Sequence, residues 1–167
     1  MRKKIRISVV GVGLMGSQHL KAIKISKKAT LHSIVDINKN SKLLAEKFKV
    51  PFFKNTLELL KKNKPDAVIV ATPNQFHEKH SINFLNSKIP LLLEKPISDR
   101  IEKAKKIIKS SKKNKTPLLI GYHRRHNQMA AIIKKKIDSG KLGKIVSANV
   151  LCWLYKNKDW YKEKWRT

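Results

Sequence analysis

The run Gly11-Val12-Gly13-Leu14-Met15-Gly16 carries glycines at its first, third and sixth positions, a spacing that could hold phosphate groups. It stands between a predicted strand, Ile5–Val10, and a predicted helix, Met15–Ser26. In that setting the first glycine permits a tight turn, the second lets a pyrophosphate approach the backbone, and the third lets helix and strand pack closely. The start of the helix adds amide donors and a positive dipole. For the motif alone, an ordinary glycine-rich turn is the alternative.

An acid at the end of the second predicted strand indicates which nucleotide the glycine run would bind. Asp36 directly follows the predicted strand Leu31–Val35. A carboxylate in this place hydrogen-bonds the adenosine ribose hydroxyls of a dinucleotide and repels a 2′-phosphate. The combination predicts dinucleotide binding and favours NAD. NADP stays open, because Lys39 or Lys42 could meet a 2′-phosphate.

Two further polar segments follow predicted strands. Ala71-Thr72-Pro73-Asn74 ends the strand Ala67–Ala71, and Glu94-Lys95-Pro96 follows the strand Leu91–Leu93. Both segments are candidates for a site, because doubly wound sheets bind ligands at the carboxyl ends of their parallel strands. His77, shortly after the first segment, could instead cap or pack within the start of a helix. Lys95 on its own would be one more surface lysine.

Short apolar runs alternate with helical stretches from Ile5 to Tyr122, a pattern typical of a parallel sheet covered by helices. Right-handed crossovers between such elements give an α/β fold with a doubly wound parallel sheet, of the Rossmann type. We predict that residues 1–122 form this domain. Its remaining predicted strands are Pro51–Phe53 and Leu118–Gly121, and its remaining predicted helices are Ser41–Phe48, Leu57–Lys61, Gln75–Ser87 and Ile101–Asn114.

Residues 123–167 break this rhythm. Gln128–Ser139 has helical spacing with Gly140 at its end, and Lys144–Tyr155 is rich in Val, Leu, Trp and Tyr, which predicts a long strand. So short a segment cannot form a core of its own, and it predicts the incomplete start of an α+β second domain. A strand there without neighbours would leave an apolar face open to water. We therefore expect poor solubility or self-association.

Charge is the most extreme feature of the composition, since 39 Lys and Arg stand against 11 Asp and Glu, for a formal net charge of +28. Such an excess can indicate a nucleic-acid partner. Most of it is lysine scattered over predicted solvent faces without interleaved aromatics, so we predict no specific nucleic-acid partner. No apolar run or leader suggests a membrane, which predicts a cytoplasmic protein. Cys152 has no cysteine partner, and we predict no metal site.

Together these segments resemble the Gfo/Idh/MocA oxidoreductases, which include glucose-fructose oxidoreductase and inositol dehydrogenases. The resemblance covers essentially the whole chain, in order and spacing. It implies an NAD(P)-dependent enzyme that transfers hydride between a nicotinamide and a secondary hydroxyl of a sugar, polyol or related cyclic compound. The matching pieces are Gly11–Gly16 with Asp36, Ala71-Thr72-Pro73-Asn74 with His77, Glu94-Lys95-Pro96, and Gly121-Tyr122-His123-Arg124-Arg125.

The resemblance also implies roles for individual residues. Lys95 is the predicted catalytic residue, because its ammonium could stabilise a developing alkoxide or relay a proton as hydride leaves the carbinol carbon. Glu94 would hold Lys95 through a charge-assisted hydrogen bond, and Pro96 would follow a cis peptide bond. Arg124 would touch the cofactor or substrate, or form a structural ion pair. The implied cofactor-binding residues are Gly11, Val12, Gly13, Leu14, Met15, Gly16, Asp36, Ala71, Thr72, Pro73, Asn74, His77, Glu94, Lys95, Pro96 and Arg124.

Members of the family carry, further along the chain, an Asp…His pair whose histidine commonly acts as general acid/base, and a large open sheet that forms the subunit interface. The resemblance therefore implies that this chain is a truncated, cofactor-binding half, inactive alone, of a protein that forms homo-oligomers. Two alternatives from other classes remain. One is a non-catalytic NAD-binding or sensor module, and the other is a basic nucleic-acid-associated protein.

Overall fold

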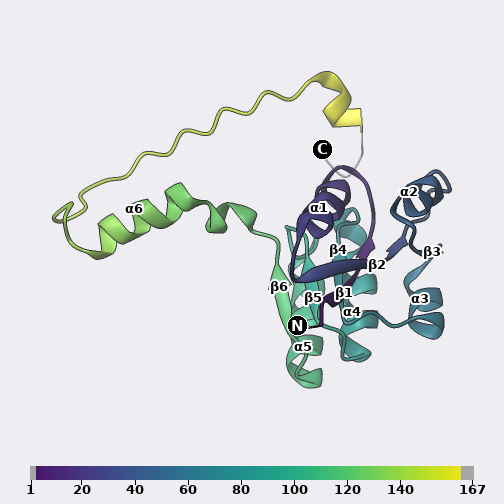
Figure 1. The fold of residues 1–167 in the computed structure, drawn as a ribbon. Coiled ribbons are helices and arrows are strands. Elements are labelled where there is room, and N and C mark those ends of the chain that lie inside the picture. The colour runs from purple at the N-terminus through teal and green to yellow at the C-terminus, as the bar shows by residue number, and fades with distance from the viewer. Residues whose placement is uncertain (1–2, 163–167) are drawn as a thin grey trace. The chain divides into compact units, whose positions relative to one another are not determined.

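The computed structural model describes residues 3–162, and the chain divides into two compact units between Gly121 and Tyr122. The first unit is built on a six-stranded sheet of order β3-β2-β1-β4-β5-β6, in which neighbouring strands are parallel (Figure 1). The predicted doubly wound α/β sheet is thereby confirmed. The strands are β1 (Ile5–Val10), β2 (Ala29–Val35), β3 (Phe52–Phe53), β4 (Ala67–Val70), β5 (Leu91–Leu93) and β6 (Leu118–Ile120).

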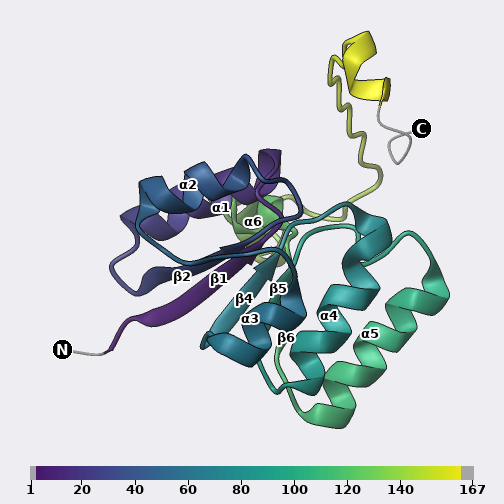
Figure 2. The same cartoon turned by 90° about the vertical axis from the view of Figure 1, so that its right-hand side faces the viewer.

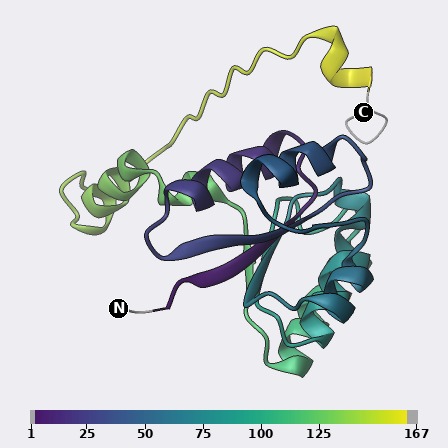
Figure 3. The same cartoon turned by 45° about the vertical axis from the view of Figure 1, so that its right-hand side comes forward.

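Helices of the first unit cover both faces of the sheet (Figures 2 and 3). One buried core includes Val9 and Leu20, beneath α1 and α2, and the other includes Val10, Phe84 and Ile107, beneath α3, α4 and α5. β1 supplies both cores because successive residues of a strand point to opposite faces. No helix within residues 3–162 has the length and apolar character needed to cross a membrane. The helices are α1 (Leu14–Ile25), α2 (Ser41–Phe48), α3 (Thr56–Lys62), α4 (His77–Asn86) and α5 (Ile101–Asn114).

The carboxyl halves of the central strands are the most deeply buried part of the sheet. The last three residues of β1, β2 and β4 are all buried, whereas the first residues of β1 and β2 are not. A buried hydrogen bond of 2.7 Å between the hydroxyls of Ser8 and Ser33 joins β1 to β2. This rigid edge is where the loops that carry the candidate site residues begin.

The predicted helix Gln75–Ser87 is divided at its start. A short 3₁₀ turn, η1 (Asn74–Phe76), precedes α4 (His77–Asn86). Phe76 has φ −96° and ψ −5°, outside regular helical geometry, and its N–H donates to the carbonyl of Pro73 at 2.9 Å. The predicted helix is confirmed, and its α-helical part starts two residues later than expected. The other predicted elements of the first unit also agree with the observed ones to within two residues.

The described part of the second unit, residues 122–162, contains one regular helix. Asn127 caps it by accepting the N–H of Met129 at 2.8 Å, and Gly140 follows its end with φ +68°. The predicted strand Lys144–Tyr155 is wrong, since no strand among the described residues pairs with this segment. Strand propensity cannot by itself supply the neighbour that a ladder requires. The elements are η2 (His123–His126), α6 (Gln128–Asp138) and η3 (Lys158–Lys162).

We expect the purified chain to self-associate through the exposed apolar side chains of residues 144–155. Val146, Trp153 and Tyr155 are 91%, 89% and 90% exposed, which is unfavourable in water for large apolar groups. Light scattering coupled to gel filtration should give a mass above 19.2 kDa that rises with concentration. The double variant Leu151→Gln, Trp153→Gln should lower that mass. A monodisperse monomer for the unaltered chain would contradict the expectation.

Candidate functional site

The glycine loop between β1 and α1 is held tightly at its first residue. Gly11 has φ +82°, and its N–H donates to the carbonyl of Val35 at 2.8 Å. A Cβ atom at this position would lie 2.9 Å from the carbonyl atoms of Ala71 and 2.9 Å from Cγ2 of Thr72. Glycine is therefore required both by the left-handed conformation and by the close approach of β4.

The other two glycines of the loop differ from each other in their surroundings. A Cβ atom at Gly16 would overlap the carbonyl oxygen of Gly11, so this glycine lets α1 start directly against the end of β1. At Gly13, by contrast, no atom lies within 4 Å of the position that a Cβ would take. Gly13 is the N-cap of α1, without a side-chain cap and with no acidic residue in the first turn. The result is an open cradle of backbone at a helix start, which fits an anionic group.

Asp36 is fixed beside this cradle. Its Oδ2 accepts the N–H of Val12 at 2.8 Å, and its Oδ1 accepts the N–H of Asn38 at 2.8 Å. Each carboxylate oxygen keeps further accepting capacity, so hydroxyl groups of a ligand above the loop could donate to it. Lys42, which could have met a 2′-phosphate, lies 3.9 Å from the carboxylate of Glu46 across one turn of α2.

Thr72 brings the end of β4 to the same place. The chain pairs here with β1, since the N–H of Ala71 donates to the carbonyl of Val10 at 2.8 Å. The hydroxyl oxygen of Thr72 is buried and has no hydrogen-bond partner among the described residues. A buried hydroxyl without a partner is costly. Together with the open space at Gly13, this oxygen fits a site that accepts a polar ligand between β1 and β4.

Glu94 and Lys95 leave the end of β5 in different directions. Glu94 is 5% exposed, and its Oε1 lies 2.7 Å from Nε2 of His19 on α1. Its Oε2 accepts the backbone N–H of Lys95 at 3.3 Å, whereas the Lys95 side chain is exposed. The expected bond between Glu94 and the Lys95 ammonium is therefore wrong, because neighbouring residues of an extended chain point to opposite sides. The Lys95–Pro96 peptide is cis, as the resemblance implied.

His77 lies beneath the site instead of on its surface. It is 1% exposed, and its Nδ1 lies 2.9 Å from the carbonyl of Pro96 while its Nε2 lies 2.8 Å from the carbonyl of Thr72. Both ring nitrogens are thus used within the protein, which leaves none for a ligand. The geometry matches the alternative of a histidine packed at a helix start.

Sequence patterns missed His19, and they gave Gly121 no role beyond its place in the segment Gly121-Tyr122-His123-Arg124-Arg125. His19 follows Gly16 by three residues on α1, and an i, i+3 spacing on a helix was the available signal that both lie on the side facing the sheet. At Gly121 a Cβ atom would come within 2.9–3.2 Å of the carboxylate of Glu94, so glycine leaves room for that side chain. Arg124 belongs to the second unit, and its contact with a cofactor or substrate stays a prediction.

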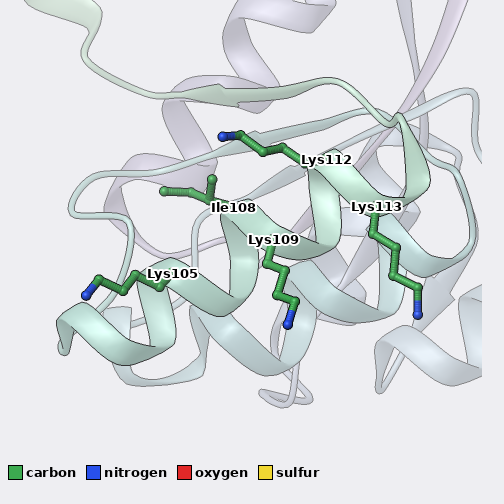
Figure 4. Close-up of a pocket in the computed structure, with 5 residues that line it drawn as sticks. All are labelled: Lys105, Ile108, Lys109, Lys112 and Lys113. Carbon is green, nitrogen blue, oxygen red and sulfur yellow. The ribbon is translucent and has the colours of Figure 1, made fainter.

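A shallow hollow of about 420 Å³ lies on α5, apart from the glycine loop (Figure 4). Its four lysine side chains do not converge on a common point. Ammonium groups that do not converge form a solvated face and give no defined anion site. The hollow is lined by Lys105, Ile108, Lys109, Lys112 and Lys113.

His80, one turn after His77, gives the protein a predicted sensitivity to acid. Burial, followed by the positive charges of Lys79 and His77, lowers the pKa of His80 to about 4. An unfolded histidine has a pKa near 6.5, so the unfolded chain takes up the proton first as the pH falls. We expect the free energy of unfolding to fall by about 1–2 kcal/mol between pH 6.5 and pH 4, allowing for partial exposure of the ring.

Urea unfolding at a series of pH values would measure this effect. The variant His80→Gln should lose that part of the pH dependence, because its side chain does not titrate. His32→Gln, a histidine on β2, is the matched control and should keep it. If the free energy of unfolding depends on pH equally in the unaltered chain and in His80→Gln, His80 is not the source of the sensitivity to acid.

A parallel, doubly wound sheet with a glycine loop, an acid after β2 and an exposed lysine after β5 defines a nucleotide-binding α/β protein. A family model agrees with this assignment. The model of the Gfo/Idh/MocA oxidoreductases, described as an oxidoreductase family with an NAD-binding Rossmann fold, matches residues 5–122. The chain belongs to this family.

Individual relatives include named dehydrogenases. Inositol 2-dehydrogenase of Corynebacterium glutamicum strain R is 27% identical over 150 residues, which cover 87% of this chain and 44% of that protein. Glucose-6-phosphate 3-dehydrogenase of Bacillus subtilis is 28% identical over 146 residues, 87% of this chain and 41% of that protein. The solved WlbA dehydrogenase from Bordetella pertussis, in complex with NADH and UDP-GlcNAcA, matches with a TM-score of 0.80 and 26% identity, over 84% of this chain and 44% of that one. The chain spans less than half the length of these relatives.

Proposed function

We propose that this chain binds NAD(H) as the cofactor-binding half of a dehydrogenase that acts on a secondary hydroxyl of a sugar, polyol or related cyclic compound. The observation that carries the proposal is the open cradle at Gly13 with the carboxylate of Asp36 fixed beside it. The substrate class is supported by the names of the relatives, which are dehydrogenases of inositol and of a sugar phosphate.

Different residues at this end of the sheet bind different parts of the cofactor. Backbone amides at the start of α1 bind the pyrophosphate, which can approach because Gly13 has no side chain. The carboxylate of Asp36 accepts the ribose hydroxyls and excludes a 2′-phosphate, which favours NAD over NADP. Ala71, Thr72, Pro73 and Asn74 border the cofactor at the end of β4.

Lys95 is the proposed catalytic residue. When bound, the cofactor accepts or donates the hydride, and the protein supplies position and charge. The Lys95 side chain is exposed at the carboxyl end of β5, where its ammonium can stabilise the alkoxide that develops as the substrate hydroxyl loses its proton. Arg124 is proposed to contact cofactor or substrate.

Further proposals concern the whole protein. We infer that residues 123–167 begin the substrate domain, that the full-length protein acts in the cytoplasm, and that it assembles as a homo-oligomer. The support is the family's organisation, in which the part beyond this chain carries the substrate-binding sheet. For this chain alone we expect cofactor binding without useful turnover.

Calorimetric titration of the purified chain with NADH and with NADPH, at moderate salt, tests the proposal. We expect NADH to bind more tightly than NADPH. Asp36→Ala should weaken NADH binding about tenfold to a hundredfold, because it removes an acceptor whose charge-assisted hydrogen bonds contribute about 1.5–3 kcal/mol. The same variant should narrow the difference between the two cofactors.

The matched control is Asp138→Ala, which removes an acid on α6 that bonds to Lys134 and lies in the second unit. It should leave NADH binding unchanged. NADH affinity that does not change in Asp36→Ala would refute the proposed site. Binding that falls steeply with salt but responds to neither variant would favour a basic polyanion-binding protein instead.

A further inference from the structure

Two histidines from helices on opposite faces of the sheet reach the same short segment after β5. His19 lies on α1 and bonds to Glu94, and His77 lies on α4 and bonds to the carbonyl of Pro96. α1 and α4 contribute to different buried cores and lie on the two sides of the sheet (Figure 2). Lys95 is exposed and lies in the chain between Glu94 and Pro96, the two residues that the histidines bond.

His77 lies between two hydrogen-bond acceptors. Both of its ring nitrogens face backbone carbonyl oxygens, at 2.8 Å and 2.9 Å, and a carbonyl oxygen can only accept a hydrogen bond. A neutral imidazole carries one N–H, so one of its nitrogens would face an oxygen lone pair against lone pair. Only the imidazolium, with two N–H donors, satisfies both partners. The ring then joins the end of β4, at Thr72, to the segment after β5.

A neighbouring histidine supports this placement of the proton. His80 lies on the same helix, one turn further, and its Nδ1 is buried without a hydrogen-bond partner among the described residues. Among the described residues no acceptor lies at this nitrogen to stabilise a second N–H, and burial, followed by the positive charges of Lys79 and His77, lowers the pKa of His80 to about 4. Of the two rings, His77 has the acceptors that hold a charge.

His19 secures the other side of the segment. The distance from its Nε2 to Oε1 of Glu94 is 2.7 Å, and the side chains are only 19% and 6% exposed. The second carboxylate oxygen of Glu94 accepts the N–H of Lys95 at 3.3 Å. Gly121 leaves the space that the carboxylate occupies. A continuous set of hydrogen bonds thus runs from the helix of the glycine loop to the backbone of Lys95.

We propose that His19 and His77 are positioning residues that hold Lys95 from the two faces of the sheet, His77 as an imidazolium between two carbonyls. The proposal deepens the proposed function and rests on it for the role of Lys95. The bonds join residues of this chain only, so they can be tested separately. The two bonds order the backbone on both sides of Lys95 before a ligand binds. Binding therefore costs less conformational entropy than it would with a mobile segment.

Nuclear magnetic resonance of the unaltered chain, labelled with ¹⁵N, tests the protonation first. Spectra that correlate ring nitrogens with ring carbon protons should place both nitrogens of His77 in the protonated range at neutral pH. His80 should show one protonated and one unprotonated nitrogen. An unprotonated nitrogen on His77 would overturn the imidazolium. This measurement needs no variant and no cofactor.

Amide hydrogen exchange then tests the positioning. His77→Phe keeps a ring and removes both donors, and His19→Leu removes the donor to Glu94; each should speed exchange at Lys95 and Ile97 at least tenfold. His19→Gln keeps an N–H donor and should restore most of the protection. His80→Gln and His32→Gln are matched controls and should leave the exchange of these two amides unchanged.

NADH titration of the same variants separates the two proposals. If the unaltered chain binds NADH, we expect His77→Phe and His19→Leu to weaken binding about fivefold to tenfold and His19→Gln to recover it. Unchanged affinity in both would overturn the positioning role, as would unchanged exchange. If the unaltered chain does not bind NADH, the proposed function fails, and the ring spectra and amide exchange still decide how the segment is held.

Discussion

Replacing Gly16 with alanine is expected to lower the free energy of unfolding of the first unit by about 3 kcal/mol or more. The added Cβ would overlap the carbonyl oxygen of Gly11, an atom of the backbone that cannot rotate away. α1 would have to move off the end of β1, which would disturb the core that includes Val9 and Leu20. Urea unfolding followed by circular dichroism measures the change.

The control for Gly16→Ala is a substitution elsewhere in the same helix. Ala22→Gly, within α1, should cost only about 1 kcal/mol through helix propensity. If Gly16→Ala unfolds at the same urea concentration as the unaltered chain, the close approach of helix and loop is not as the structure has it.

Gly13→Ala, unlike Gly16→Ala, should leave the free energy of unfolding nearly unchanged. It should weaken NADH binding at least tenfold. Gly13 has a negative φ of −63°, and no atom lies within 4 Å of the new Cβ. The methyl group would instead occupy the space through which a pyrophosphate approaches the start of α1. Calorimetric titration with NADH, beside urea unfolding of the same sample, measures both quantities.

Gly143→Ala is a control for NADH binding alone, because Gly143 also has open space at its Cβ position and lies in the second unit, but its φ of +65° makes alanine strained there. It should not alter NADH affinity. If NADH binds Gly13→Ala as tightly as it binds the unaltered chain, the ligand does not approach the backbone at this glycine. A loss of both stability and binding would show that Gly13 is structural, like Gly16.

The sequence alone was sufficient for the fold of the first unit, because its signals are local. Apolar runs such as Ala67–Val70 and helical spacing such as that of Ile101–Asn114 recur at the lengths that a parallel sheet requires. The glycines of the loop were recognisable because their spacing, between a predicted strand and a predicted helix, is itself the signal.

Long-range partners were the part that local patterns could not supply. Lys144–Tyr155 has strand propensity but no neighbouring strand in the described chain. The partners of His77 are the carbonyl oxygens of Thr72 and Pro96. Because every residue has a backbone carbonyl, no pattern of side chains could have predicted these two partners. Glu94 was expected to bond to the lysine next to it, and the fold gave it His19 from a distant helix.

The strand order also bears on how the chain could fold during synthesis. β1, the first strand to be made, takes the centre; β2 and β3 add to one side of it, and β4, β5 and β6 add in turn to the other. No completed pair has to open to admit a later strand. A nascent chain could therefore close the glycine loop against β4 before Lys95 leaves the ribosome, and the sheet would be complete once Ile120 has emerged.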